Sequence, residues 1–508
     1  MYQKKFLLHL YPAKGCMILT REMIIIAITF SFKQKCSVMK LNSNVIMQNF
    51  LVRMKRSGVL EFLKNFFFFF FLAFLVLFSC SSNNSTIEPV SFEKPWDSPY
   101  RVSTTYKHQL VNENGNFLYI LNKTAWAYFL CEYPDKVLEN AKKHGANVIR
   151  VCLEGTPYED SLHYDLWPWG GTRNNPDFST FNLPYWQQVE ERIKLAGEHG
   201  IGFDIVLYFD FKPTIDDLAV QKKYCDMVLK RLSKYSNILT WEIMNEEISN
   251  ELFQDSIATY IKNNDPYKHL IISSDGTTDD ALWPHKEWMS MAIVHTCTGN
   301  QPGYDLENWY LNIARNIRQY GKPAFNNESG REKRHKNDDP IHRRKQGWLF
   351  SNAGCFWTWH SWDGCEGIND ATYFADGWQY LKPMKNYYES IPFWKLEPTY
   401  TVCILKESDL IFSTMSSPER DISVMYCCTK QTHQMVENAK VYLRIKNGLY
   451  TLRFIKPENL ELIAQMEFVS EGLKNQYEIK LPTFMDDLII EITVKGRIEE
   501  KTLIEGTL

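Results

Sequence analysis

The feature that most constrains the fold is an alternation of short apolar runs with amphipathic stretches between about residues 112 and 398. Eight runs have the length and composition of buried strands, and helix-like stretches lie between most of them. The strand-like runs are 117–121, 147–153, 202–209, 238–244, 269–273, 292–295, 323–326 and 354–359, and the helix-like segments are 136–144, 185–199, 218–234, 252–263, 308–320 and 341–352. Strands joined through helices pair in parallel, so this region predicts an α/β domain.

A (β/α)8 barrel accounts for this pattern. Such a barrel needs about 250 residues, which the span supplies. A doubly wound sheet would show the same alternation, but no Gly-x-Gly-x-x-Gly turn follows the first strand-like run. We therefore expect a TIM barrel as the catalytic domain over residues 99–397, with its functional groups at the carboxyl ends of the strands.

The pattern changes after Pro398. Short strand-like runs at 401–405, 422–427, 440–445, 450–455, 477–480 and 488–494 follow one another without a helical period, and Asn447-Gly448 supplies one turn. This density of short strands predicts a small all-β sandwich over 398–496, followed by a tail over 497–508. It carries no evident catalytic constellation, so packing or glycan binding is its expected role.

The N-terminal region has the pattern of a secretory signal. Residues 66–78 are apolar without a break, and Lys55, Arg56 and Lys64 precede them. The run is shorter than the roughly 20 apolar residues of a membrane-spanning helix. Ser79-Cys80 after Leu77-Phe78 resembles a bacterial lipobox, in which the cysteine is lipidated. The alternative is an ordinary signal peptide followed by a coincidental cysteine.

This interpretation divides the N-terminal region into three parts. Residues 1–53 are an over-extended reading frame or a disordered extension, 54–80 are a lipoprotein signal peptide, and 81–98 are a flexible tether. With Cys80 lipidated, we expect the protein at the cell envelope, anchored to the outer membrane and facing the periplasm or the cell surface.

Composition excludes some partners and leaves others open. The formal net charge of −3 gives no electrostatic reason to expect nucleic acid. Aromatic residues make up 14% of the chain, and their rings suit the apolar faces of sugars, although large domains also bury such rings. Neither a Cys-x-x-Cys pair nor another metal-ligand spacing occurs, so we expect buried free thiols, no metal and no cofactor.

Two glutamates stand at strand ends where a barrel holds its catalytic groups. Glu246 follows the fourth strand-like run and Glu328 follows the seventh. These strands are not neighbours, so the two carboxyl groups can face each other across the barrel mouth. Glycoside hydrolysis needs such a pair, one acid and one carboxylate. A single glutamate there would more often be an ion-pair partner, but the pair predicts a glycosidase.

The sequence around these glutamates resembles the retaining barrel glycosidases that include cellulase family 5. In that group an Asn-Glu pair ends strand four and a second Glu ends strand seven. The resemblance implies that Glu246 is the acid/base, that Glu328 is the nucleophile and that Asn245 binds the sugar 2-hydroxyl. It also implies that Arg150 hydrogen-bonds the nucleophile.

The same resemblance adds two residues to the expected substrate site. His295 ends the sixth strand-like run, and Trp359 lies on the eighth, where a sugar platform is expected. His295 is followed by Thr296 and Cys297, whereas cellulase-like members have His-x-Tyr, so the strand-six aromatic is missing at that spacing. A satisfied buried histidine is the alternative interpretation of His295.

A closer resemblance, to an apiosidase-like barrel family, begins at Thr124-Ala125-Trp126. It continues from Trp167-Pro168-Trp169 to residue 201, and members of that family often end in a small β-sandwich. It implies that Trp126, Trp167 and Trp169 bind substrate, although the last two are equally interpreted as packing anchors of their loop. Asn122-Lys123 stand where the family tends to have Gly-Asp.

These features together predict a glycoside hydrolase that cleaves O-glycosidic bonds of poly- or oligosaccharides by retaining double displacement. Two carboxyl groups about 5–5.5 Å apart would give retention. Glu242 is expected deeper in the barrel and Glu247 facing away. The alternatives are a catalytically inactive surface glycan-binding lipoprotein, or a scaffold barrel whose sandwich binds partners. We expect a monomer that touches the membrane only through its lipid anchor.

Overall fold

The structure is a computed structural model that describes residues 96–154, 166–209, 216–276, 278–296, 306–329, 339–360, 376–405, 407 and 409–497. The predicted signal peptide, Cys80 and most of the predicted tether lie outside the described residues. Within the described ranges, no helix has both the length and the apolar character that crossing a membrane requires.

Eight parallel strands form a nearly closed barrel, in the order β10-β9-β8-β5-β4-β13-β12-β11. The strands are β4 (Leu121–Thr124), β5 (Val148–Cys152), β8 (Gly202–Tyr208), β9 (Ile238–Met244), β10 (Leu270–Ile272), β11 (Ala292–Thr296), β12 (Ala324–Ser329) and β13 (Phe356–Trp359). The order runs without interruption between its ends, β10 and β11, through parallel pairings. The predicted (β/α)8 TIM barrel is confirmed.

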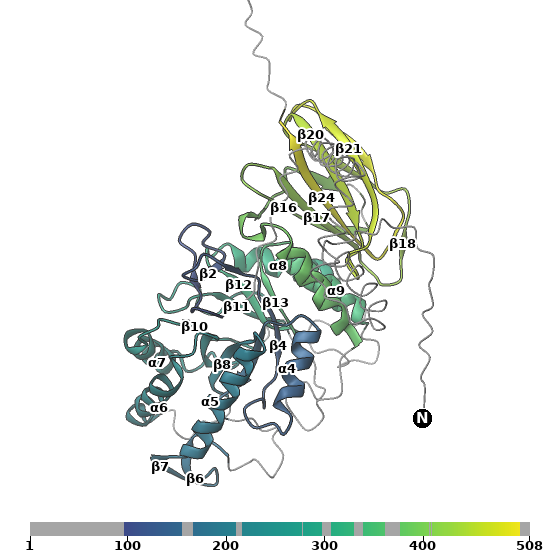
Figure 1. Ribbon diagram of the computed structural model, residues 1–508. Coiled ribbons are helices and arrows are strands. Elements are labelled where there is room, and N and C mark those ends of the chain that lie inside the picture. Colours follow the sequence, from purple (N-terminus) through teal and green to yellow (C-terminus); the bar gives the residue numbers. More distant parts are fainter. Residues whose placement is uncertain are drawn as a thin grey trace, which may run out of the picture. The chain divides into compact units, whose positions relative to one another are not determined.

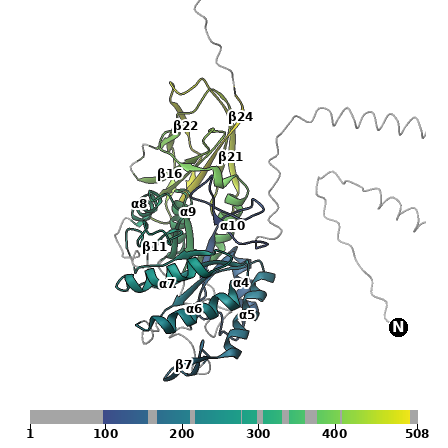
Figure 2. The same cartoon turned by 90° about the vertical axis from the view of Figure 1, so that its left-hand side faces the viewer.

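Amphipathic helices cover the outside of the barrel, as Figures 1 and 2 show for α5, α6 and α7. The helices are α4 (Pro134–Lys143), α5 (Leu183–Glu198), α6 (Leu218–Leu232), α7 (Glu251–Asn264), α8 (Leu306–Arg318), α9 (Pro340–Ser351) and α10 (Leu381–Glu389). The side chains of Asn182, Asp217 and Asp339 accept backbone N–H groups at the starts of α5, α6 and α9. Each of these residues fixes where a helix begins, and therefore how long the preceding loop is.

The first barrel strand begins at Leu121, later than the 117–121 run predicts. Phe117 belongs instead to β3 (Phe117–Leu118), which pairs with β2 (Leu110–Val111) in a small antiparallel sheet that also contains β1 (Arg101–Val102). The Phe117 ring stacks on Trp394 with centroids 5.0 Å apart. The true strand contains the buried polar residues Asn122, Lys123 and Thr124, so no apolar run marks it.

A β-hairpin is inserted between β5 and α5, where the sequence indicated only a loop. It consists of β6 (Trp169–Thr172) and β7 (Asn175–Phe181), which pair antiparallel. Gly171 has a φ of +69°, and a Cβ there would lie 2.4 Å from the carbonyl oxygen of Asn175. The turn therefore requires glycine at this position.

The C-terminal region is an all-β sandwich with its own hydrophobic core, as predicted. A six-stranded antiparallel sheet has the order β14-β16-β17-β24-β20-β21, and smaller sheets are β15-β19-β22 and β18-β23. The strands are β14 (Glu397–Pro398), β15 (Cys403–Leu405), β16 (Leu410–Ser416), β17 (Ile422–Thr429), β18 (Met435–Val436), β19 (Lys440–Leu443), β20 (Gly448–Ile455), β21 (Leu462–Ser470), β22 (Tyr477–Lys480), β23 (Phe484–Met485) and β24 (Asp487–Gly496). The sequence did not indicate β16 or β21, and β21 is a largely exposed edge strand without a clear apolar alternation.

Helix α9 joins the barrel to the sandwich. Its residues from Arg343 to Ser351 are all buried, including the charged ones. Trp348 stacks on Tyr426 of β17, with centroids 5.7 Å apart and an interplanar angle of 11°. Arg344 donates to both carboxylate oxygens of Asp487, at 2.7 and 2.9 Å, and Lys345 donates to the carbonyl oxygen of Thr429 at 3.1 Å. Buried charges are tolerated only when paired in this way, so α9 fastens the sandwich to the barrel through both aromatic and charged contacts.

Candidate active site

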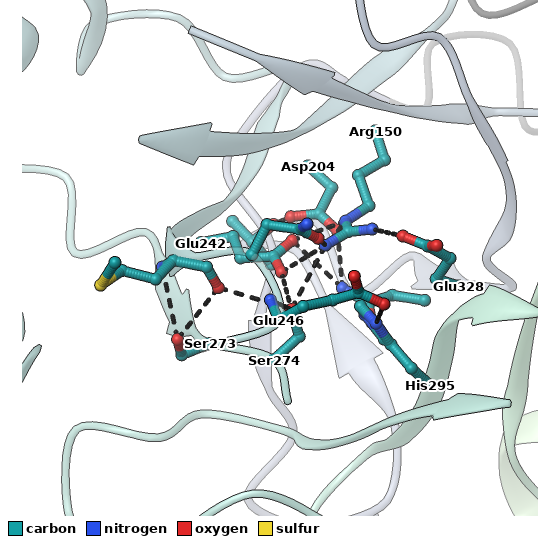
Figure 3. Close-up of polar contacts among 12 residues, drawn as sticks. Arg150, Asp204, Glu242, Glu246, Ser273, Ser274, His295 and Glu328 are labelled. Atoms are coloured by element: carbon teal, nitrogen blue, oxygen red, sulfur yellow. Dashed lines mark hydrogen bonds and ion pairs between the residues drawn. The ribbon is translucent and has the colours of Figure 1, made fainter. Parts of the chain in front are cut away.

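The polar centre of the barrel is built around Arg150 of β5, whose side chain is fully buried (Figure 3). Its Nε and Nη2 donate to the two oxygens of Glu242 at 2.7 and 2.6 Å, and its Nη1 donates to Oε2 of Glu328 at 2.7 Å. Burial alone would lower the pKa of Arg150, but the charges of Glu242, Glu328 and Asp204 raise it well above its usual range. The guanidinium is therefore a permanent positive charge under the site.

Glu242 is locked at the bottom of this network. Besides its two bonds from Arg150, it accepts from the Ser274 hydroxyl at 2.6 Å and from the Asn327 side-chain amide at 3.1 Å. Its side chain is fully buried. A carboxylate with four such donors is a structural support for Arg150, which agrees with the deeper position expected from strand alternation.

Glu328 at the end of β12 lies higher, with 3% of its side chain exposed. Oε2 accepts from Arg150, and Oε1 lies 3.5 Å from Nδ1 of His360, which is also 3.1 Å from the carbonyl oxygen of Ser329. The ion pair with Arg150 favours the ionised carboxylate, which is the form that a nucleophile needs.

Glu246 approaches the site from the loop after β9 in an unusual backbone conformation. Its φ is +51°, in the left-handed region that costs a non-glycine residue about 1 kcal/mol or more. Its N–H donates to the Ser274 hydroxyl at 3.2 Å, which helps to hold this turn. The side chain is 40% exposed and Oε1 lies 3.4 Å from Nδ1 of His295. Glu246 is thus the solvent-facing carboxyl group of the pair, whereas Glu247 bonds to Ser249 within its own loop.

Asn245 is oriented by Arg150. Its side-chain oxygen accepts from Nη2 of Arg150 at 2.7 Å. Because the oxygen faces the guanidinium, the NH2 group of the same amide faces the opposite way. It is therefore placed to donate to a ligand hydroxyl.

His295 at the end of β11 is fully buried, and its ring is turned toward Glu246 (Figure 3). Its Nε2 has no hydrogen-bond partner among the described residues. One nitrogen of His295 and one carboxylate oxygen each of Glu246 and Glu328 all lie within 4.8 Å of one another. The structure therefore brings together three residues that are far apart in the sequence.

The predicted aromatic residues are all buried. The Trp126 ring lies 4.5 Å from the guanidinium carbon of Arg150 and packs against Phe209, and Trp359 on β13 is 2% exposed. Trp169 stacks on Phe181 with centroids 4.7 Å apart, and Trp167 is 1% exposed. The rings of Trp167 and Trp169 pack against the β6–β7 hairpin. Packing was one of the two roles that the sequence left open for them.

Sequence reasoning did not identify Asp204, Ser274 or Asn327 as members of the site. All three are fully buried. Asp204 accepts from the Thr240 hydroxyl at 2.5 Å and lies 3.8 Å from Nε of Arg150. An acidic residue inside the apolar strand β8 was the available signal, because such a charge needs a partner.

Burial, followed by repulsion from Glu242, raises the pKa of Asp204 to about 7. The folded protein therefore binds a proton at Asp204 that the unfolded chain releases near pH 4. Between pH 4 and 7 this group makes the free energy of unfolding fall as the pH rises.

Asp204→Asn is expected to remove this contribution, by up to about 1.4 kcal/mol per pH unit. Urea denaturation at several pH values between 4.5 and 7 measures the slope. Asp280→Asn, at an exposed carboxyl group, is the control and should keep the wild-type slope. An unchanged slope in Asp204→Asn would show that Asp204 carries no such proton.

A barrel with two glutamates facing each other across its mouth is the architecture of the glycoside hydrolase class. The family comparison is more specific. Residues 104–359 match the family described as "Apiosidase-like, catalytic domain", and the chain belongs to this family. The apiosidase-like resemblance noted in the sequence is thereby confirmed.

Solved structures share the fold over most of the chain. One described as "Glycoside hydrolase" has a TM-score of 0.61 at 16% identity, covering 80% of this chain and 99% of its own. A glycoside hydrolase family 5 protein from Bacteroides vulgatus ATCC 8482 has a TM-score of 0.61 at 17% identity, covering 79% of this chain and 96% of its own. Both alignments are too long to cover the barrel alone. None of the curated proteins compared with the chain matches it.

Proposed function

We propose that the protein hydrolyses O-glycosidic bonds of poly- or oligosaccharides with net retention of anomeric configuration. The observation that carries the proposal is the closeness of the two carboxyl groups. One carboxylate oxygen of Glu246 lies within 4.8 Å of one carboxylate oxygen of Glu328. Retaining glycosidases hold their two carboxyl groups about 5–5.5 Å apart, whereas inverting enzymes leave room for a water molecule at about 6.5–9.5 Å.

The different surroundings of the two carboxyl groups support different roles. Glu328 is buried and paired with Arg150, so it is the nucleophile that attacks the anomeric carbon. Glu246 is exposed and free of that ion pair, so it is the acid that protonates the leaving oxygen. In the second step Glu246 takes a proton from water, and the resulting hydroxide oxygen displaces Glu328 from the anomeric carbon.

Arg150 and Asn245 act on these steps without exchanging protons. Arg150 stabilises the carboxylate of Glu328 before attack and again when it leaves. The NH2 group of Asn245 is placed to bind the hydroxyl next to the anomeric centre. Hydrogen bonds at that hydroxyl strengthen in the transition state of such reactions.

The stereochemistry of the product tests the mechanism directly. The full chain is first screened against polysaccharides and aryl glycosides, and proton NMR then follows the first anomer released from a cleaved substrate. Retention is the expected result. An inverted first product would reject the two-step mechanism, and cleavage of no glycoside would reject the hydrolase assignment.

We also propose that lipidation of Cys80 anchors the enzyme to the outer membrane, on the strength of the signal-like sequence before it. Cys80→Ser is expected to move the protein from the membrane fraction to the soluble fraction after cell lysis. Cys131→Ser, a change at a cysteine within the folded barrel, is the control. Membrane association that survives Cys80→Ser would reject the lipid anchor.

A further inference from the structure

We propose that Glu246, His295 and Glu328 form a binding site for a divalent transition-metal ion of the Zn²⁺ type, which occupies the barrel mouth in place of the sugar. The proposal uses residues of the proposed catalytic site but does not depend on hydrolysis. It concerns a ligand that competes with the substrate and therefore inhibits the enzyme.

The chemistry and spacing of the three groups fit such an ion. Imidazole nitrogen and carboxylate oxygen are typical zinc ligands at about 2.0–2.2 Å, which puts neighbouring ligand atoms of a tetrahedral site about 3.3 Å apart. Nδ1 of His295 and Oε1 of Glu246 are 3.4 Å apart. Three protein ligands and an open fourth position are the usual arrangement of an accessible zinc site.

The remaining ligand needs only a small movement. The oxygen of Glu328 lies within 4.8 Å of the other two ligand atoms. Glu246 is the mobile partner, because its side chain is 40% exposed while His295 and Glu328 are held in the barrel. Rotation of the Glu246 carboxyl group toward Glu328 brings the ligand atoms together, while Arg150 keeps Oε2 of Glu328 in place.

Two independent observations favour a cation at this position. His295 is fully buried, and its Nδ1 makes only a long contact of 3.4 Å, with Glu246, among the described residues. A buried nitrogen with so long a hydrogen bond gains from a closer partner. In addition, Glu242 and Glu328 share the one guanidinium of Arg150, so the carboxylates outnumber this positive charge even before Glu246 is counted.

Direct binding measurements test the site without any substrate. The full chain is stripped of metal with a chelator, and zinc uptake is followed by equilibrium dialysis, with the visible absorption of Co²⁺ as a second readout of nitrogen and oxygen ligation. We expect about one ion per chain. His295→Asn and Glu246→Gln should each weaken binding by about tenfold or more.

The control is His433→Asn, which removes an exposed histidine bonded to Asp339 in a different part of the chain and should leave uptake unchanged. Glu246→Gln changes an exposed side chain, so it keeps the test valid if His295→Asn fails to fold. Zinc uptake equal to wild type in both site variants, or no uptake at millimolar Zn²⁺, would overturn the proposal. Metal binding through these residues in a chain that cleaves no glycoside would sustain this inference and reject only the hydrolase.

Discussion

Glu328→Gln is expected to lower kcat on every cleaved substrate by about 10⁴-fold or more, with little change in substrate binding. The amide has almost the same shape as the carboxylate, but it cannot attack the anomeric carbon. Without that attack no glycosyl-enzyme intermediate forms, and the 2.7 Å ion pair with Arg150 that keeps the nucleophile ionised is lost as well. Steady-state kinetics on the best substrate from the screen measures the loss.

Glu247→Gln is the matched control, because Glu247 lies in the same mouth region but bonds to Ser249 of its own loop. Its kcat should stay close to that of the wild-type enzyme. A Glu328→Gln enzyme that cleaves as well as wild type would show that another group is the nucleophile. Equal melting temperatures of the variants exclude a loss of fold as the cause.

Glu246→Gln should have an effect that depends on the leaving group. For sugars with poor, alkyl-type leaving groups, we expect kcat/KM to fall about 10²–10⁴-fold, the usual contribution of a general acid. For aryl glycosides whose leaving group departs without protonation, the first step should be far less affected.

Comparing kcat/KM on one aryl glycoside and one natural-type substrate separates this role from a structural one. A structural role would lower the rates on both substrates by the same factor. An equal loss on the two substrates would therefore contradict the assignment of Glu246. Because the Glu246 side chain is exposed, we expect the variant to stay folded, and a thermal melt checks this expectation.

The barrel could be predicted because its signals are local. The run 238–244 coincides with β9, and the asparagine and glutamate after it mark the strand end where catalytic groups stand. Where a strand is polar, as in β4 with Asn122 and Lys123, the apolar pattern fails and the boundary is misplaced. The buried polar layer of the barrel supplies the partners that these residues need.

The supporting half of the site was harder to predict for the same reason. Asn327 of β12 reaches Glu242 of β9 only because two non-neighbouring strands converge at the barrel axis, and no local motif in the sequence indicates that contact. The tryptophans illustrate the opposite problem. An aromatic residue on a loop suits a sugar or a core equally well in sequence, and only the packing of Trp169 on Phe181 shows where its ring lies.

Helix α9 has a consequence for how this protein can be divided and inherited. A chain ending after β14 would expose Trp348 and leave Arg344 without Asp487. Leaving a large apolar side chain exposed instead of buried costs about 1.5–3 kcal/mol, a large share of the stability of an ordinary domain. The barrel therefore depends on the C-terminal strands for its stability. A related protein without these strands would need a different barrel surface at α9.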